Sequence, residues 1–225
     1  MTPKEPLTPV ITIDGPSGAG KGTLSRLVAS RLGYHLLDSG ALYRLTALAA
    51  MNERVDIDDP EAVAKIARHL NVAFEADGTE TRVLLKDRDV SREIRTEAVS
   101  MNASKVAAYS PVREALLQRQ RDFRKEPGLV ADGRDMGTTV FPDARVKIFL
   151  TASPEARAER RYLQLLEKGE KVDVEALAED IRRRDQQDSE RSVSPLKPAE
   201  DAHCLDSTDL SIDEVLEQIL KTVNA

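Results

Sequence analysis

The chain has 225 residues, of which 40% are apolar and 32% are charged, a balance typical of a globular protein and not of a disordered one. Its formal net charge of −6 argues against a general nucleic-acid binder, because such a protein needs a basic surface. The single cysteine, Cys204, excludes an intramolecular disulfide framework and a cysteine-based zinc site. No stretch reads as a signal peptide or a membrane span, so we expect a cytoplasmic protein with no membrane partner.

The first seventy residues alternate between short apolar runs and amphipathic stretches. A β-rich apolar run predicts a strand over residues 10–14, and a second short strand is predicted over residues 35–38. Apolar residues at helical spacing predict a helix over residues 21–32 and another that begins at a cap, Ser39. A third helix is predicted over residues 60–70, with proline in its first turn.

The pattern changes after the third helix. Two β-rich runs, residues 71–76 and 81–86, flank Asp77-Gly78, a residue pair that favours a hairpin turn. The sequence therefore predicts a small antiparallel unit inserted into an otherwise alternating chain.

The second half of the chain returns to alternation. Strands are predicted over residues 129–132, 146–151 and 202–206, and helices over residues 95–109, 111–125, 154–168, 174–187 and 211–223. Short strands that alternate with helices imply an α/β fold with a five-stranded parallel sheet, covered by helices on both faces. Ligands of such sheets bind beyond the carboxyl ends of the strands. Gly15, Ser39, Arg134 and Ser153 each follow a predicted strand, so we expect them at the carboxyl edge of the sheet.

A glycine-rich stretch links the first strand to the first helix, in the position that a phosphate-binding loop requires. It reads Gly15-Pro16-Ser17-Gly18-Ala19-Gly20-Lys21-Gly22-Thr23. Its glycines allow successive N–H groups to point inward, and the helix N-terminus adds partial positive charge. Lys21 supplies a full charge for the outer phosphates, so we expect the loop to bind ATP.

The loop departs from the usual pattern after the lysine. Gly22 stands where a hydroxyl residue normally contacts magnesium, and the nearest hydroxyl belongs to Thr23. We therefore expect phosphates and water to hold Mg²⁺, with Thr23 and Asp132 as the candidate protein contacts. A capping or loop-bracing carboxylate is the alternative explanation for Asp132.

Arginines follow the later strands at helical spacing. One helix face carries Arg157, Arg160 and Arg161, and another carries Arg184, Asp188 and Arg191. Pairing to Glu155, Glu159 and Asp180 would make these ordinary solvated faces. Their position between the phosphate loop and the last strand instead favours a helical lid over a nucleotide.

Several classes of phosphate-loop protein fit poorly. The chain lacks the Asn-Lys-x-Asp string with which GTPase switches bind guanine, and it has little room for the extra modules of a motor ATPase. A small kinase is favoured, because the arginines can serve an acceptor site and a lid.

Three further blocks of sequence accompany the loop. They are Asp38-Ser-Gly-Ala-Leu-Tyr-Arg44, Ala131-Asp-Gly-Arg-Asp-Met-Gly-Thr138 and Val140-Phe-Pro-Asp-Ala144. Together with the loop, and in this order, they resemble the bacterial cytidylate kinase family along nearly the whole chain. The resemblance implies one nucleoside-monophosphate kinase domain over residues 1–225. Within it the resemblance implies a monophosphate-binding region over 39–104, a β insert near 70–95 and a lid over 155–172.

The resemblance also implies an activity, the ATP-dependent conversion of CMP and dCMP to their diphosphates, and roles for individual residues. The acceptor phosphate would contact Arg44, Arg134 and Arg191, with Ser39 nearby. The cytosine would contact Ser104, Arg113 and Asp135, and the sugar would contact Arg184 and Asp188. Arg157 and Arg161 would move onto the transferring phosphates. The resemblance implies that the catalytic residues are Lys21, Arg134, Arg157 and Arg191. It also implies a monomer whose partners are ATP and CMP or dCMP, with no nucleic acid.

The chemistry of cytosine agrees with these roles. Its exocyclic amine is a donor and its N3 and O2 are acceptors, which a carboxylate, an arginine and a hydroxyl complement. Two other readings stay open. One is another small phosphate-loop kinase, for a different nucleoside monophosphate or for a small alcohol with Asp38 or Asp132 as a base. The other is a nucleotide-binding switch, which would transfer phosphate to nothing small.

Overall fold

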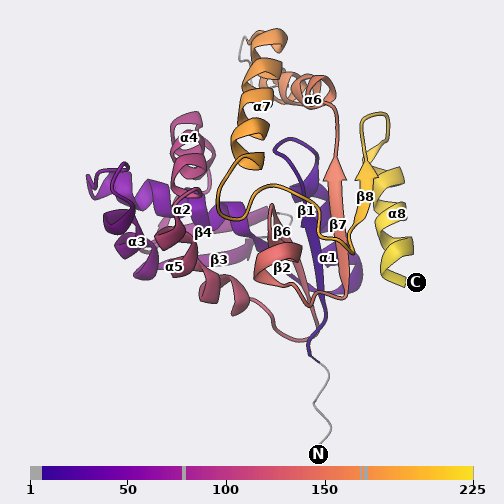
Figure 1. Ribbon diagram of the computed structural model, residues 1–225, viewed down its shortest axis with the longest axis horizontal. Coiled ribbons are helices and arrows are strands. Elements are labelled where there is room, and N and C mark those ends of the chain that lie inside the picture. Colours follow the sequence, from indigo (N-terminus) through magenta and orange to yellow (C-terminus); the bar gives the residue numbers. More distant parts are fainter. Residues whose placement is uncertain (1–6, 78–79, 168, 170–171, 225) are drawn as a thin grey trace, which may run out of the picture. The chain divides into compact units, whose positions relative to one another are not determined.

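The protein is described by a computed structural model that covers residues 7–77, 80–167, 169 and 172–224 (Figure 1). The chain divides into two compact units, residues 1–37 together with 121–225, and residues 38–120. No helix in these described ranges has the length and apolar character that a bilayer crossing requires.

The first unit is built on a five-stranded sheet with the strand order β2-β6-β1-β7-β8. Its strands are β1 (Val10–Asp14), β2 (His35–Asp38), β6 (Leu129–Gly133), β7 (Val146–Thr151) and β8 (His203–Asp206). β1 pairs in parallel with β6 and β7, and β7 pairs in parallel with β8. The predicted α/β class and all five predicted strands are confirmed.

Four helices accompany this sheet: α1 (Lys21–Leu32), α6 (Pro154–Glu167), α7 (Val174–Ser189) and α8 (Ile212–Asn224). α1 and α8 cover one face, where Ile13 and Ile148 of the sheet pack with Val28, Val215 and Ile219. Burial of each such side chain stabilises the fold by about 1.5–3 kcal/mol. α6 and α7 lie beyond the carboxyl ends of the strands, because α6 leaves β7 at that edge (Figure 1).

The other face of the sheet carries an element that the sequence pattern did not predict. Residues Met136–Val140 form a π-helical turn, η2, which packs on β1. Gly137 allows this approach, because a Cβ there would lie 2.8 Å from Oγ1 of Thr12. Such turns are frequent at functional sites.

The second unit contains the helices α2 (Ser39–Asn52), α3 (Pro60–Arg68), α4 (Glu97–Val106) and most of α5 (Ser110–Arg121), with a 3₁₀ turn, η1 (Glu93–Arg95). α2 packs against α3, α4 and η1. A second sheet has the order β3-β4-β5, with β3 (Val72–Asp77), β4 (Glu80–Leu85) and β5 (Arg88–Asp89). The predicted antiparallel insert is confirmed, although Gly78 of its turn lies outside the described residues.

Three local predictions need correction. Asp38, not Ser39, caps α2, because its carboxylate accepts the N–H of Ala41 at 2.9 Å and a negative charge suits a helix N-terminus. The helix predicted over 95–109 is interrupted at Thr96, whose extended backbone separates η1 from α4. The short third strand β5 was not predicted, since two residues carry no periodic pattern.

Replacement of Gly15 by alanine should destabilise the fold by about 3 kcal/mol or more. The φ angle of Gly15 is +150°, and an added Cβ would lie 2.0 Å from the carbonyl oxygen of Leu150. Gly33→Ala is the matched control, because Gly33 has a φ of +67° and open space around it, so its loss should be about 1–2 kcal/mol. Urea unfolding measures both variants, and equal losses would contradict the packing argument.

Candidate functional site

The glycine-rich loop wraps around the charge of Lys21. Gly18 and Gly20 adopt positive φ angles of 81° and 91°, and Gly20 stands at the start of α1. Because Gly20 has no side chain to cap the helix, the first N–H groups are left for an anion. The ammonium group of Lys21 is buried and donates to the carbonyl oxygen of Pro16 at 2.8 Å. The loop thus holds one full positive charge beside a helix N-terminus.

The carboxylate of Asp132 lies next to the first turn of α1. Its Oδ2 is 3.5 Å from the point that a Cβ on Gly22 would occupy. No group of three or more His, Cys, Asp or Glu side chains suited to a metal occurs in the described ranges. The carboxylate of Asp132 and the hydroxyl of Thr23 are oxygen donors, the ligand type that Mg²⁺ prefers.

Arg157 of α6 connects the loop to α7 through its contacts with Ser17 and Asp185. Its guanidinium donates to the carbonyl oxygen of Ser17 at 3.1 Å and to that of Ala152 at 2.9 Å. It also forms a two-pronged ion pair with Asp185 of α7, at 3.0 and 2.5 Å. Arg157 is only 2% exposed, so the phosphate loop, α6 and α7 meet at one buried cation.

A second buried ion cluster joins α7 to the end of β6. One oxygen of Asp188 accepts from Nε of Arg134 and the other accepts from Arg191. Burial of the Arg134 guanidinium opposes its charge, but the carboxylates of Asp188, Asp132 and Asp185 raise its pKa above the ordinary value. Two of the three arginines predicted to contact the acceptor phosphate are thus held by a shared carboxylate.

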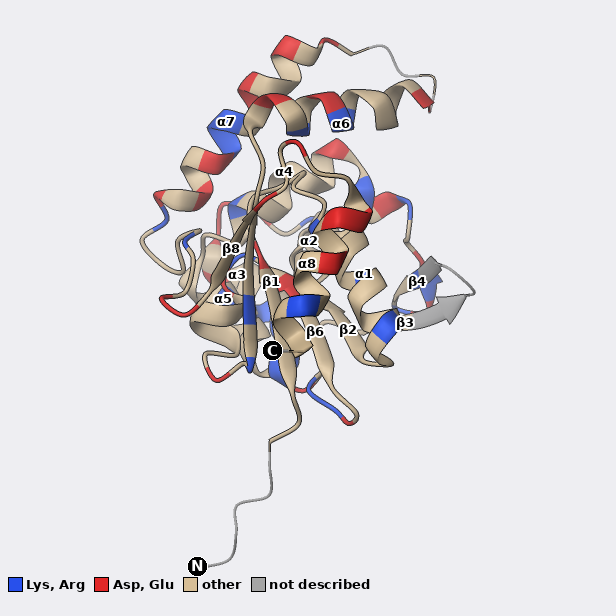
Figure 2. Cartoon of the chain, turned by 90° about the vertical axis from the view of Figure 1, so that its right-hand side faces the viewer, with Lys and Arg blue, Asp and Glu red and all other residues tan. Residues whose placement is uncertain are grey.

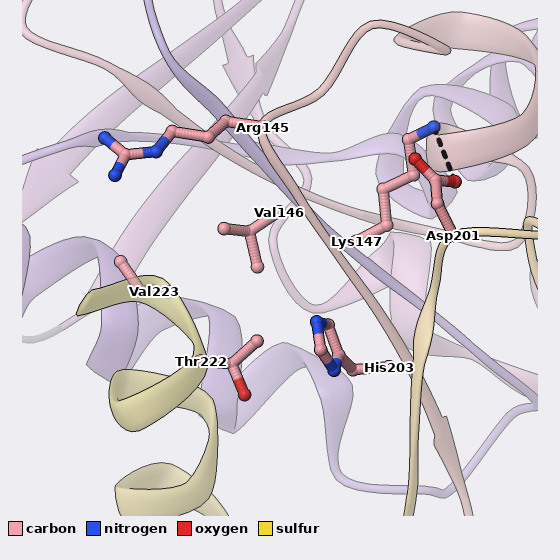
Figure 3. A pocket seen from close by; sticks show the side chains of 7 residues that line it. All are labelled: Arg145, Val146, Lys147, Asp201, His203, Thr222 and Val223. Carbon is pink, nitrogen blue, oxygen red and sulfur yellow. Dashed lines mark hydrogen bonds and ion pairs between the residues drawn. The ribbon is translucent and has the colours of Figure 1, made fainter. Parts of the chain in front are cut away.

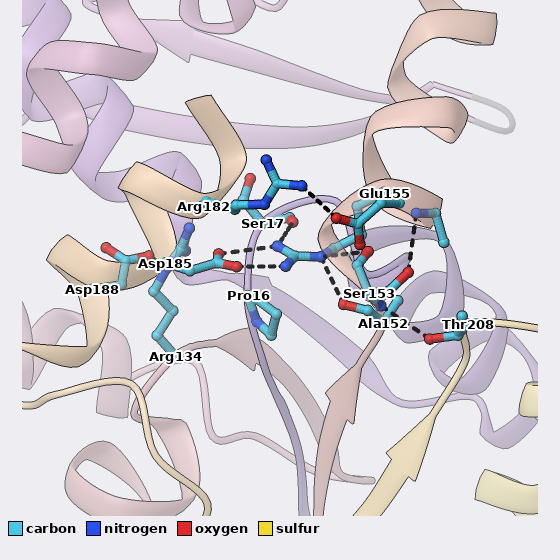
Figure 4. A network of polar contacts seen from close by, with 12 residues as sticks. Pro16, Ser17, Arg134, Ala152, Ser153, Glu155, Arg182, Asp185, Asp188 and Thr208 are labelled. Atoms are coloured by element: carbon cyan, nitrogen blue, oxygen red, sulfur yellow. Dashed lines mark hydrogen bonds and ion pairs between the residues drawn. The ribbon is translucent and has the colours of Figure 1, made fainter. Parts of the chain in front are cut away.

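α7 therefore turns an acidic face, and not only an arginine face, toward the sheet. Asp185 and Asp188 are three residues apart (Figure 4), and they accept from Arg157 of α6 and from Arg134, the residue after β6. The sequence analysis missed Asp185, although its spacing from Asp188 was the available signal. Among the described residues, Glu155 and Asp180 of the alternative pairing bind the outer arginines Arg182 and Arg183. Both α6 and α7 carry acidic and basic residues (Figure 2).

The other arginines that were predicted for the lid and for the sugar of the acceptor have different surroundings. Arg160 is turned toward the segment after β8, where it donates to the carbonyl oxygens of Ser207 and Thr208. Arg161 and Arg184 are half-buried. Arg161 forms no hydrogen bond or ion pair with any other residue that the structure describes. It therefore remains available to a ligand.

Asp14, which the sequence analysis also missed, ends β1 directly before the loop. Its two carboxylate oxygens accept the N–H groups of Met136 and Gly137, each at 2.8 Å. Burial raises its pKa to about 7, while these two hydrogen bonds act in the opposite direction. The neighbouring Asp135 is 4% exposed and starts the η2 turn. A single carboxylate thus connects the phosphate loop with the segment that carries Asp135.

The second unit holds the other predicted contacts. Arg44 pairs with Asp38 at 2.8 Å, and its buried Nε has no hydrogen-bond partner within the described ranges. Arg113 is buried, donates to the carbonyl oxygen of Ala107 at 3.0 Å and lies over the ring of Tyr43. Ser39 is buried and Ser104 is half-buried.

The predicted residues thus fall into two sets. The first unit carries Lys21, Asp132, Arg134, Asp135, Arg157, Arg161, Arg184, Asp188 and Arg191, and the second carries Ser39, Arg44, Ser104 and Arg113. Hydrogen bonds directly connect Arg134, Asp188 and Arg191 in the first unit.

A small pocket lies at the opposite edge of the sheet from the loop (Figure 3). Val146 and His203 line it at the starts of β7 and β8, and Thr222 lines it near the end of α8. Its volume of about 230 Å³ is below the range of about 300–1,000 Å³ that is typical of ligand pockets. Lys147, which also lines it, donates to the carboxylate of Asp201 at 2.9 Å (Figure 3).

Comparisons with known proteins agree on one family. A family model described as cytidylate kinase matches residues 11–225. The cytidylate kinase of Aeromonas salmonicida (strain A449) is 59% identical over 214 residues, which cover 95% of this chain and 93% of that protein. The cytidylate kinase of Pseudomonas aeruginosa (strain UCBPP-PA14) is 61% identical over 215 residues, which cover 95% and 94%.

One solved structure shares the fold at low sequence identity. The crystal structure of an uncharacterized protein from Eubacterium ventriosum ATCC 27560 matches with a TM-score of 0.50 and 10% identity, covering 96% of this chain and 99% of that one. At this identity the likeness concerns the fold alone.

Removal of the shared carboxylate by Asp188→Ala should destabilise the protein by about 3 kcal/mol, because it leaves two arginines without their buried counter-ion. Asp180→Ala on the same helix is the control. Asp180 and its partner Arg183 are both more than 60% exposed, so its loss should stay below about 1 kcal/mol. Urea unfolding of both variants is the measurement, and a small effect of Asp188→Ala would contradict the buried cluster.

Proposed function

Since this chain belongs to the cytidylate kinase family, we propose that it transfers the terminal phosphoryl group of ATP to CMP and dCMP, forming CDP and dCDP. One observation carries this proposal. A family match over residues 11–225 includes a phosphate loop whose lysine is buried in the loop and whose helix start has no side-chain cap. That combination suits the tail of a nucleoside triphosphate.

We assign ATP to the loop, residues Gly15 to Thr23. Lys21 exchanges its contact with the Pro16 carbonyl for phosphate oxygens. Arg161, which has no described partner, and Arg157 then supply further charge from the lid, residues 155–172. Arg157 must give up part of its pairing with Asp185 to do so.

For the phosphate of the acceptor nucleotide we assign Arg134 and Arg191 from the first unit. Their present partner is the carboxylate of Asp188, so a phosphate competes for the same guanidinium donors. From the second unit, within the monophosphate-binding region 39–104, we assign Arg44 together with Ser39. The partnerless Nε of Arg44 supports this role, because a buried donor without an acceptor is costly.

For the base we assign Asp135, Arg113 and Ser104, and for the sugar Arg184 and Asp188. A carboxylate accepts from the exocyclic amine of cytosine, whereas uracil presents a carbonyl at that position. Because Asp135 is almost fully buried, the mismatch with uracil cannot be relieved by water. This is the physical basis of the proposed preference for CMP over UMP.

The transfer step needs alignment and charge rather than a general base. The attacking atom is a phosphate oxygen, which is largely deprotonated at neutral pH because its second pKa is about 6. Lys21 and the arginines reduce the repulsion between two anions and orient them for in-line transfer. Bound Mg²⁺, beside Asp132 and Thr23, would neutralise charge on the phosphates. Closure of the lid would exclude water from the transfer.

A panel of acceptors tests the proposal. With ATP and magnesium, consumption of ATP should require CMP or dCMP, and GMP or small alcohols should not replace them. Lys21→Ala should lose about a hundredfold or more of the rate, because a charge donor to the transition state is removed. Transfer to an alcohol, or tight ATP binding without transfer to any acceptor, would contradict the proposal. We also expect a monomer, which sedimentation of the purified protein can check, and a cytoplasmic location, which fractionation of cells can check.

Asp135→Asn should lower the preference for CMP over UMP about tenfold to a hundredfold, because its amide can donate to the uracil carbonyl. The measurement is the ratio of kcat/KM for the two acceptors, with KM for ATP as the internal control. An unchanged ratio would remove Asp135 from the base-binding set.

A further inference from the structure

Asp14 is a buried acid that the proposed transfer step does not use. It stands between Ile13, in the core of the sheet, and Gly15, the first residue of the phosphate loop. Both of its oxygens accept backbone N–H groups of consecutive residues, Met136 and Gly137, at 2.8 Å each.

A carboxylate at this place is costly. Asp14 is 4% exposed, and burial raises its pKa to about 7, with a further contribution from the negative charge of Asp135. The two backbone hydrogen bonds and the charge of Lys21 offset only part of this effect. An apolar residue would avoid the cost of burial but would leave both N–H groups without an acceptor.

The turn that Asp14 holds is fixed from two sides. Asp14 binds its amides, and the close approach of Gly137 to Thr12 and Lys147 leaves no room for a Cβ on the other side. At the start of the turn the carbonyl oxygen of Asp135 accepts the N–H of Thr139 at 2.8 Å. The backbone of Asp135 is thus connected rigidly to the end of β1.

We propose that Asp14 is a positioning residue, which holds the turn at residues 135–137 so that the Asp135 carboxylate meets the base of the acceptor nucleotide. The inference rests on the proposed function, because it assumes that Asp135 selects cytosine. It extends that function because Asp14 would influence which acceptor nucleotide binds without contacting either substrate. Asp14 also ties the two substrate-binding segments to the same strand end.

Asp14→Asn tests this inference, since asparagine has the same shape but turns one of the two acceptor atoms into a donor that faces an N–H group. We expect KM for CMP to rise about tenfold and the CMP-to-UMP ratio of kcat/KM to fall about tenfold. KM for ATP should change by less than about twofold. A purely structural role would lower the unfolding midpoint without changing the ratio, and that result would overturn the inference.

Thr12→Val is the matched control. Thr12 is fully buried on the same strand, faces the same turn, and its hydroxyl has no hydrogen-bond partner in the described part of the chain. The variant should keep the CMP-to-UMP ratio of the unmodified enzyme. A shift as large as that of Asp14→Asn would show that any change on this strand disturbs the acceptor site, and would overturn a specific role for Asp14.

Gly137→Ala is a second test of the inference, to be used if the Asp14→Asn variant does not fold. The added Cβ would meet Oγ1 of Thr12 and displace the same turn from its other side. The CMP-to-UMP ratio should fall, and adding Thr12→Ala should restore part of it. An unchanged ratio in Gly137→Ala would overturn the inference, because the turn would then not control selectivity.

Asp135→Asn, measured in parallel, distinguishes a failure of the role of Asp14 from a failure of the role of Asp135. If it loses the preference for CMP while Asp14→Asn keeps it, the inference about Asp14 alone is wrong. If neither variant loses the preference, the proposed role of Asp135 is wrong and the inference falls with it.

Discussion

A site that receives two polyanions must concentrate positive charge, and the protein must neutralise that charge when no substrate is bound. The described structure does this with carboxylates and carbonyl oxygens. Asp188 holds Arg134 and Arg191, Asp185 holds Arg157, and the Pro16 carbonyl holds Lys21. Under the proposed function, phosphate would replace the present partners of these four residues. Their pairing in the absence of substrate lowers the cost of keeping arginines buried.

Under the proposed function, the same exchange would allow ligand binding to move the proposed lid. Arg157 is bonded at once to the phosphate loop, to the end of β7 and to α7. A phosphate that competes with Asp185 for Arg157 would weaken the link between α6 and α7, whereas the bond to Ser17 can remain. In the second unit, the pair of Arg44 with Asp38 at the start of α2 holds a further arginine in the same way.

Asp14 satisfies neutral backbone groups in a similar way. Consecutive N–H groups of a turn need acceptors when they are buried, and one carboxylate satisfies both. Its position at the end of β1 makes the phosphate loop and the Asp135 turn neighbours in space, although they are more than a hundred residues apart in sequence. The parallel register of β1 with β6 brings them to the same edge of the sheet.

The sequence alone determined the alternation of strands and helices, the phosphate loop with Lys21, and the family, because each depends on local periodicity or on contiguous motifs. The same information did not reveal Asp14 or Asp185, whose partners are far away along the chain, nor the turn at Met136–Val140, which has no periodic signal. It also assigned the cap of α2 to Ser39 instead of Asp38, since both residues suit that place. Only the tertiary structure decided which carboxylate neutralises which arginine, because ion pairs follow distances in space, and the strand order of the sheet sets those distances.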